Sequence, residues 1–454
     1  MKARKPLSQL FGRPASKMLA LCCAAFLMPG LATAQTLMEA YELAVQNDPK
    51  FLAAKAESSA SEMAVDQARA GFLPTIMFDA EQMTTRQEVE ESANPIYGAG
   101  STKYDTFSYT LSISQPIFRK EVIEQFKQSK SITKQAEYTA LASEQDLLMR
   151  TVSAYLVVLA AKDSLALATA ERKSVGKLVE TAKARRQSGL GTATQQYDAD
   201  ARYAVANAHE IEAQSKLRDA YQGLREITGE NISNVQKLLE DFSLEYPEPQ
   251  AVESWLETAA QKNLILLARL EGVNVARQEI KRKSAGHYPN LSVKLNHSYK
   301  NAGSTLYGGG STVNSTDVML QLSVPIYEGG SVKTATKEAS YRYQKAQEEY
   351  EFEYRSLDRR TRAAFDAIVS GVSLINALKK SVVAQQSVLR VKTEGYKSGL
   401  NTILPVLDAQ RDLYSAKRDF AQSRYDYLIN RLRLKQAAGT LSEADLAYVA
   451  EKLH

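Results

Sequence analysis

Four short segments of this chain alternate apolar and polar residues with the period of a β-strand. In residues 106–114, for example, every odd position is apolar or aromatic and every even position is Thr or Ser. The four segments are residues 75–86, where the alternation is weakest, 106–114, 291–300 and 316–324. Each spans about ten residues, the length of a tilted strand that crosses a bilayer. The pattern predicts two strand hairpins, at about 75–114 and 291–324, although a half-buried sheet of a soluble protein would alternate in the same way.

Two longer stretches have the composition of helices. Residues 119–188 and 329–398 contain no proline and are rich in Ala, Glu, Lys, Gln and Leu. A helix of that length would extend on the order of 100 Å. In the helix after the second stretch, apolar residues recur at seven-residue spacing: Val406, Leu413, Phe420, Tyr427 and Leu434. Because such a repeat produces left-handed coiled-coil packing, we expect two long helical hairpins, at about 119–228 and 329–439.

The two arms of the first helical hairpin differ in length. The returning helix, residues 192–228, is only about half as long as the helix before it. A further predicted helix, residues 49–71, has nearly the missing length. We therefore expect these two helices to stack end to end beside the long helix and to form a rod that continues into the strands.

The second half of the chain repeats the first. The tripeptide Ser-Gly-Leu at 188–190 recurs at 398–400, and Gly229 recurs as Gly439, both 210 residues later. Ordered matches of glycine, proline and apolar positions across a helical region indicate a duplication. The predicted organisation is a first repeat over 35–230, a connecting segment over 231–252, a second repeat over 253–440 and a C-terminal segment over 441–454.

The first 34 residues have the features of a secretory signal peptide. They carry five basic residues, no acidic ones, and an apolar run that ends at Ala32-Thr33-Ala34. This ending predicts cleavage before Gln35. Both cysteines of the chain lie in this segment, so we expect neither a disulfide nor a lipid anchor.

Removal of the signal segment changes the charge of the chain. The net charge of +5 falls to zero when its five basic residues are removed, which argues against nucleic acid as a partner. No unbroken apolar run of about 18 residues follows residue 34, so no membrane-spanning helix is expected. Passage of the chain through a membrane would then require a closed β-barrel.

The second helical hairpin carries a family resemblance. Residues 396–402, Tyr-Lys-Ser-Gly-Leu-Asn-Thr, with Val-Leu-Asp-Ala at 406–409 and Tyr-Asp-Tyr-Leu at 425–428, closely resemble the TolC family of outer-membrane efflux and type I secretion channels. The ending Gly-Thr-Leu-Ser-Glu at 439–443 is also similar, and the resemblance covers essentially the whole mature chain. It implies a mainly α fold with a small β part. In that family three protomers, each a tandem-duplicated unit with four strands, form a 12-stranded outer-membrane β-barrel and a periplasmic α-barrel of long coiled-coil helices. The number of predicted strands supports the need for several protomers, because four strands cannot close a barrel alone. It does not fix the number at three.

The resemblance also implies a function and a set of partners. We expect a homotrimeric exit duct in the outer membrane of a Gram-negative cell, in contact with outer-membrane lipid. A periplasmic adaptor and an inner-membrane transporter, either ABC or proton-driven, would open its periplasmic end and supply cargo for type I protein secretion or multidrug efflux. The ending of the chain looks slightly closer to that of protein-secretion members. The alternatives are a periplasmic coiled-coil adaptor and a soluble scaffold protein.

Two hairpin tips are candidate docking sites. The resemblance implies that Gly189 and Leu190 in the first repeat, and Gly399 and Leu400 in the second, meet the adaptor. Glycine at these positions permits a tight reversal of the chain. The same residues could serve only as helix caps, and the two interpretations are compatible.

A candidate gate follows the second tip. The resemblance places Tyr396 and Asp408 where the family carries residues that constrict the closed end. Three copies of Asp408 would form a carboxylate ring that attracts cations and repels anions. The family's other gate positions differ here, because Asn401 replaces an arginine, Pro405 an aspartate and Gln195 an acidic residue. The alternative is that Asp408 is an ordinary solvated helix residue.

The sequence gives little support to an enzyme. The four histidines, His209, His287, His297 and His454, lack the spacing of metal ligands. The glycine-rich segments 98–102 and 308–312 lack the lysine of a phosphate-binding loop. We therefore expect no catalytic residue, no metal site and no cofactor.

Overall fold

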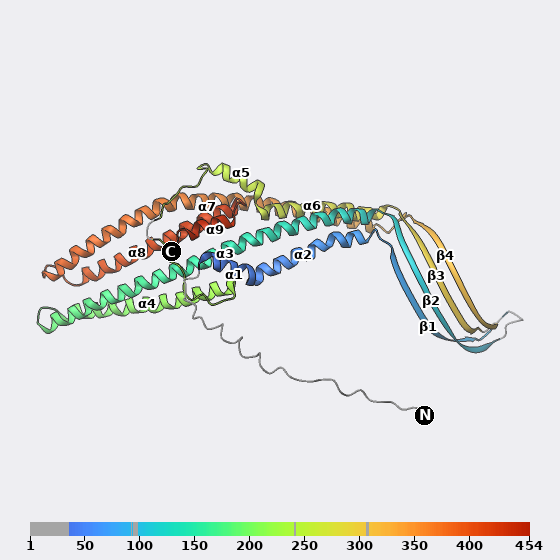
Figure 1. The fold of residues 1–454 in the computed structure, drawn as a ribbon, viewed down its shortest axis with the longest axis horizontal. Coiled ribbons are helices and arrows are strands. Elements are labelled where there is room, and N and C mark those ends of the chain that lie inside the picture. Colours follow the sequence, from blue (N-terminus) through green and yellow to red (C-terminus); the bar gives the residue numbers. More distant parts are fainter. Residues whose placement is uncertain (1–35, 92, 94–98, 240–241, 306–307) are drawn as a thin grey trace, which may run out of the picture.

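The computed structural model describes residues 36–91, 93, 99–239, 242–305 and 308–454. The predicted signal peptide and its cleavage site lie outside the described residues. The central part of the first predicted strand loop, residues 94–98, does so as well. In the remainder, helices form a long rod and a four-stranded sheet extends from one end of it (Figure 1).

Two helices run the length of the rod, as predicted. They are α3 (Lys120–Gln187) and α7 (Ser331–Lys397), and each returns through a shorter helix, α4 (Ala193–Thr228) or α8 (Leu404–Ala437). The remaining length beside them is filled by α2 (Pro49–Ala70) and α6 (Leu264–Ser284). The place of α2 agrees with the stacking predicted for the first repeat, and α6 takes the corresponding place in the second. Short elements surround the middle of the rod: α1 (Leu37–Asn47), α5 (Val252–Lys262) and α9 (Glu443–Ala450), and η1 (Ala285–His287) lies beside the sheet.

The two stacking joints are built alike. At the first joint the Asn47 side chain donates to the carbonyl of Thr228 at 2.9 Å, beside Gly229. At the second joint Asn263 donates to the carbonyl of Ala437 at 3.0 Å, beside Gly439. Both glycines have positive φ, 72° and 70°, which L-residues other than glycine rarely adopt. Each repeat therefore has a glycine of positive φ beside a hydrogen bond from an asparagine side chain to a backbone carbonyl, in addition to the shared order of helices.

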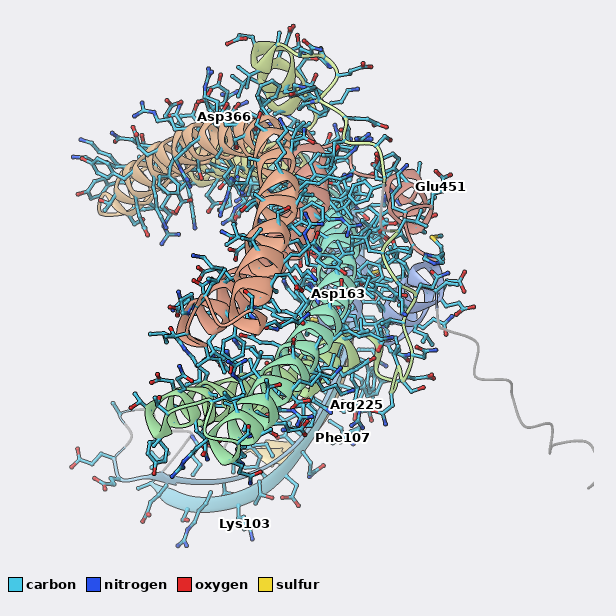
Figure 2. All side chains as sticks on the ribbon, turned by 90° about the vertical axis from the view of Figure 1, so that its left-hand side faces the viewer. Lys103, Phe107, Asp163, Arg225, Asp366 and Glu451 are labelled. Atoms are coloured by element: carbon cyan, nitrogen blue, oxygen red, sulfur yellow. The ribbon has the colours of Figure 1, made fainter. Side chains whose placement is uncertain are left out.

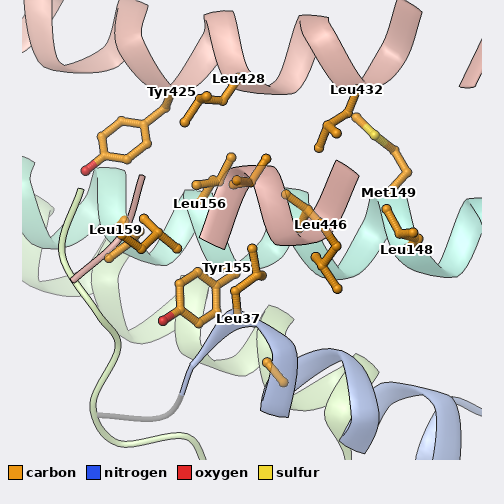
Figure 3. Close-up of a cluster of buried hydrophobic side chains, with 14 of the residues drawn as sticks. Leu37, Leu148, Met149, Tyr155, Leu156, Leu159, Tyr425, Leu428, Leu432 and Leu446 are labelled. Carbon is orange, nitrogen blue, oxygen red and sulfur yellow. The ribbon is translucent and has the colours of Figure 1, made fainter. Parts of the chain in front are cut away.

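The core of the rod lies at the seam that the heptad repeat predicted. Val406, Leu413, Tyr427 and Leu434 are all buried, and Phe420 is partly buried. Small residues Ala409, Ala416 and Ser423 between them are buried as well, which allows close helix approach. Figure 3 shows the largest cluster, in which side chains of α3 and α8 meet residues of α1 and α9, among them Tyr155, Leu156, Tyr425, Leu428, Leu37 and Leu446.

The strands are longer than predicted. They form one antiparallel sheet in chain order, made of β1 (Thr75–Val89), β2 (Gly100–Arg119), β3 (Asn290–Thr305) and β4 (Gly308–Ser323). With 15 to 20 residues each, they exceed the expected ten. The second predicted hairpin left residues 301–315 between its strands as an exposed loop, and this is wrong for Gly308-Gly309-Gly310, because these residues begin β4. A Cβ on Gly310 would lie 2.5 Å from the carbonyl oxygen of Ala302, so this glycine serves close strand approach rather than a turn.

Register explains why the sequence indicated shorter strands. One row across the sheet near the helices is entirely apolar: Ile76, Ile113, Leu295 and Val318. Three rows farther out on the same face, Phe107 lies between polar residues, in the row Gln82, Phe107, Asn301 and Thr312. The apolar part of this face ends near the stacked rings of Tyr109 and Tyr299, whose centroids are 5.1 Å apart. This face is therefore mostly apolar in the half of the sheet next to the helices, where His297 and Thr316 interrupt it, and mostly polar beyond that half.

Two helices are apolar enough, by length and composition alone, to span a membrane. They are α3 and α7, each of which contains such an 18-residue window. The expectation above concerned unbroken apolar runs, and core helices of soluble proteins have the same length and composition as these two. In α3 the apolar residues Leu147, Val152 and Leu156 are buried in the rod, as they would be in a core helix.

Candidate functional site

The two tips of the helical hairpins have the same geometry. Gly189 and Gly399 have φ values of 73° and 81°, and each allows the next amide to return to its helix. The amide of Leu190 donates to the carbonyl of Arg185, and that of Leu400 to the carbonyl of Gly395, both at 2.8 Å. Each tip therefore ends in a helix cap that the glycine makes possible.

The leucines at the tips are not part of any core. Leu190 is 71% exposed and Leu400 is 83% exposed. Capping requires glycine but not a large apolar side chain beside it. The structure thus leaves one large apolar side chain exposed at the outermost point of each hairpin.

Tyr396 lies in the core of the rod rather than on its surface. It is 3% exposed and packs in a cluster with Val175, Val179, Ile403 and Val406. The guanidinium of Arg185 lies 5.0 Å from the centre of its ring. Burial raises the pKa of the Tyr396 hydroxyl, so it stays protonated at physiological pH. Tyr396 of the second hairpin therefore packs against the first hairpin close to the two tips.

Asp408 has an ionic partner that sequence reasoning missed. The Nη2 atom of Arg202 on α4 donates to its Oδ1 atom at 2.7 Å, and Arg411 lies 3.7 Å from the same oxygen. The carboxylate is 41% exposed, so it is paired while still in contact with solvent. Because Arg202 belongs to the first hairpin and Asp408 to the second, this pair ties the two hairpins together near their tips.

Further polar contacts connect the same two hairpins at a greater distance from the tips. Arg418 donates to Glu171 at 2.8 Å, and the Glu171 carboxylate is 6% exposed. Tyr425 donates to Asp163 at 2.7 Å. These contacts lie between two separate apolar clusters, one at the middle of the rod and one near the tips. The boundary between the two hairpins is therefore partly polar.

The positions that depart from the family pattern have local roles. Pro405 lies in the first turn of α8, where proline fits because its missing N–H would be unpaired in any case. The amide of Asn401 donates to the Gly395 carbonyl at 3.1 Å and extends the cap of α7. Gln195 donates its backbone N–H to the Thr192 side chain, which caps α4. Tyr396 and Asp408, the two predicted gate residues, both contact side chains of the first hairpin.

No catalytic cluster emerges from the part of the chain that the structure describes. Within it, no group of three or more His, Cys, Asp or Glu residues is arranged to hold a metal ion. The His297 ring lies on the sheet, 2.9 Å from the hydroxyl of Thr316. The chemistry of the described residues is that of packing, capping and ion pairing.

Comparison with known proteins gives extended matches. The model of the outer membrane efflux protein family matches residues 40–230 and 255–440. The sequence is 32% identical to the outer membrane protein TolC of Vibrio cholerae over 415 residues, which cover 91% of this chain and 92% of that protein. It is 29% identical to the alkaline protease secretion protein AprF of Pseudomonas aeruginosa over 92% of this chain and 87% of that protein.

Solved structures agree in fold. The outer-membrane channel OprN superposes with a TM-score of 0.76 at 17% identity, over 89% of this chain and 90% of that one. The outer membrane protein VceC of Vibrio cholerae gives a TM-score of 0.72 at 19% identity, over 89% of this chain and 96% of that one. Together with the duplicated helical hairpins and the four-stranded sheet, these matches show that the chain belongs to the outer membrane efflux protein family.

Proposed function

We propose that three copies of this chain form a passive exit duct that crosses the outer membrane and the periplasm. The observation that carries the proposal is the sheet. Both of its outer strands, β1 and β4, have one unpaired edge, and a row of four apolar residues, Ile76, Ile113, Leu295 and Val318, crosses one face of its helix-proximal half. A sheet in lipid has to close on itself, because unpaired backbone groups have no water to bond with. Four strands are too few to close, so other copies have to supply the rest.

The rod supports the same proposal. It is continuous with the sheet and places α5, α9 and α1 on one side of a curved wall of long helices, as the end-on view in Figure 2 shows. Closure of the sheet by other copies would bring their curved walls together around one axis. The wall would then enclose a tunnel that leads from the tips to the barrel.

Docking of a periplasmic adaptor at the tips accounts for the exposed leucines. We expect the double variant Leu190→Asp/Leu400→Asp to assemble and reach the outer membrane but to lose at least about tenfold in export, because a charge in a small apolar contact costs about 1–3 kcal/mol per site. The measurement is secretion or drug tolerance in cells whose own copy is deleted. Leu190→Met/Leu400→Met should retain export. Full export by the aspartate variant would exclude the tips as the docking surface.

The Arg202–Asp408 pair is the proposed gate contact, because it holds the two hairpins of a protomer together next to the closed end. Asp408→Ala should therefore raise the single-channel conductance of the purified protein in planar bilayers and weaken its block by divalent cations. The charge-exchanged variant Arg202→Asp/Asp408→Arg should return conductance toward the unmodified value. If Asp408→Ala leaves both the conductance and the block unchanged, Asp408 is only a solvated helix residue.

Protein secretion is the proposed export route. Two relatives named for protease secretion, AprF and PrtF of Dickeya chrysanthemi, are 29% and 28% identical and cover 92% and 93% of this chain. The probable efflux pump outer membrane protein TtgC of Pseudomonas putida is 24% identical and covers 82%. Cross-linking in cells, followed by identification of the inner-membrane partner, tests this route. An ABC transporter is the expected partner, and a proton-driven drug pump would assign the duct to multidrug efflux.

A further inference from the structure

The duplicated joints of the rod differ in one charge. Arg360 lies 210 residues after Arg150, and Asn263, the N-cap of α6, lies 215 residues after Asp48, the N-cap of α2. In the first repeat Arg150 binds both oxygens of Asp48, at 3.0 and 2.7 Å. The second repeat has a neutral amide where the first has this carboxylate. An arginine and a helix N-terminus are therefore present at the second joint without the anion that lies between them at the first.

A cavity of about 590 Å³ occupies this place in the second repeat. Its basic lining consists of Arg359 and Arg360 from α7 and Arg433 from α8, and the start of α6 contributes Asn263. Its acidic lining residue is Asp146, which already pairs with Lys50 at 2.8 Å and with Arg150 at 2.9 Å. The cavity therefore carries an excess of positive charge.

Two of the three arginines have no acidic partner in the described part of the chain. Arg360 contacts Glu353. Arg433 donates to the neutral side chain of Asn430 at 3.2 Å, and among the described residues no carboxylate pairs with Arg433 or Arg359. Guanidinium groups bind carboxylate and phosphate oxygens in pairs, and several of them around one cavity favour an oxyanion over a neutral ligand.

At least one of the lining arginines, Arg433, faces the inner side of the wall. On α8, Arg431 binds Glu245 and Lys435 binds Asp445, and both acidic residues belong to the short segments on the outer side. Arg433 lies two residues from both Arg431 and Lys435. Two residues of an α-helix turn the side chain by about 200° around the helix axis, so Arg433 points away from the side that these two residues face. In Figure 2, α5 and α9, the latter marked by Glu451, lie on the convex side of the wall.

We infer that this cavity is an anion-binding site on the inner wall of the duct, which takes carboxylate or phosphate groups of solutes or cargo that pass through. The inference rests on the proposed function, because only a closed wall gives the cavity an interior to face. Three copies would place a ring of such sites at the level of the joint, where the tunnel meets the segment that leads to the barrel.

Pyrophosphate is a suitable probe, and its binding to the detergent-extracted protein is measured by isothermal titration calorimetry. We expect saturable binding that weakens at least tenfold in Arg359→Gln/Arg433→Gln. The matched control is Arg342→Gln, an exposed arginine of α7 that pairs with Glu338 four residues before it, and its binding should be unchanged. Asn263→Asp introduces the carboxylate of the first repeat and keeps the helix cap, while it loses the hydrogen bond to the Ala437 carbonyl. It should also abolish binding without removal of any arginine.

Channel recordings separate this inference from the proposed function. If the protein forms no conducting channels in planar bilayers, the proposed function fails. If it conducts, but pyrophosphate does not bind or binds Arg359→Gln/Arg433→Gln as tightly as the unmodified protein, the anion site alone is refuted. Tight binding to Asn263→Asp would refute it as well, because the cavity would then hold two anions at once.

Discussion

Substitution of Gly439 by alanine should destabilise the protein strongly and prevent its accumulation in the outer membrane. Gly439 has a φ of 70°, and a Cβ built on it would overlap the backbone carbonyl of Lys262 at the second joint. The left-handed conformation costs a residue other than glycine about 1–2 kcal/mol, and steric overlap in a packed site adds about 1–3 kcal/mol. Neither term is relieved by a rotamer change, because alanine has no rotamer and the overlapped atom is backbone.

The thermal midpoint of the extracted protein and its amount in the outer membrane check this expectation. Gly223→Ala is the matched control, because Gly223 lies inside α4 and no neighbouring atom comes within 4 Å of the place that an alanine Cβ would take. Alanine there should be neutral or stabilise by about 0.5–1 kcal/mol, since it favours the helix. A Gly439→Ala protein as stable as this control would show that the joint tolerates a different geometry.

Substitution of Arg150 by alanine should have the second largest effect. It leaves the Asp48 carboxylate, which is 4% exposed, without its bidentate partner at the first joint. Loss of one partner of a buried ion pair costs about 3–5 kcal/mol. Arg355→Ala is the control, because Arg355 is 76% exposed and its pair with Glu351 contributes at most about 0.5 kcal/mol. Equal midpoints for the two variants would contradict a structural role for the Asp48–Arg150 pair.

The same pair predicts a pH dependence. The hydrogen bond from Arg150 holds the pKa of Asp48 below its ordinary value. A lowered folded-state pKa contributes stability that is complete above the ordinary value and is lost as pH falls through the folded value. The stability difference between the unmodified protein and Asp48→Asn should therefore be constant near neutral pH and shrink below about pH 4. A difference that persists to pH 2 would assign the effect to packing rather than to charge.

The regular parts of this fold could be predicted because they repeat. The heptad spacing from Val406 to Leu434 identified the buried seam of α8, and the alternation in residues 106–114 identified the apolar half of β2. Strand ends could not be found the same way, because beyond Tyr109 and Tyr299 the sheet face is mostly polar and the alternation disappears. The start of β4 was taken for a loop because of its glycines at 308–310, since glycine occurs both in turns and where two strands approach closely.

The candidate site was less accessible to sequence reasoning. The tip residues were singled out by the family resemblance, and in the structure both tip leucines are exposed. The partner of Asp408 could not be found, because Arg202 lies 206 positions away in the other hairpin and no spacing rule links them. The difference between Asp48 and Asn263 played no part in the predictions made from the sequence. It acquires meaning only once the structure places arginines and a cavity beside it.

The central claim, that several copies close the sheet into a membrane-spanning duct, is tested most directly by the mass of the protein extracted from the outer membrane. Light scattering on the detergent complex, corrected for bound detergent, should give three times the mass of the mature chain. A mass of one chain, or recovery of the protein from the soluble periplasm, would contradict the account.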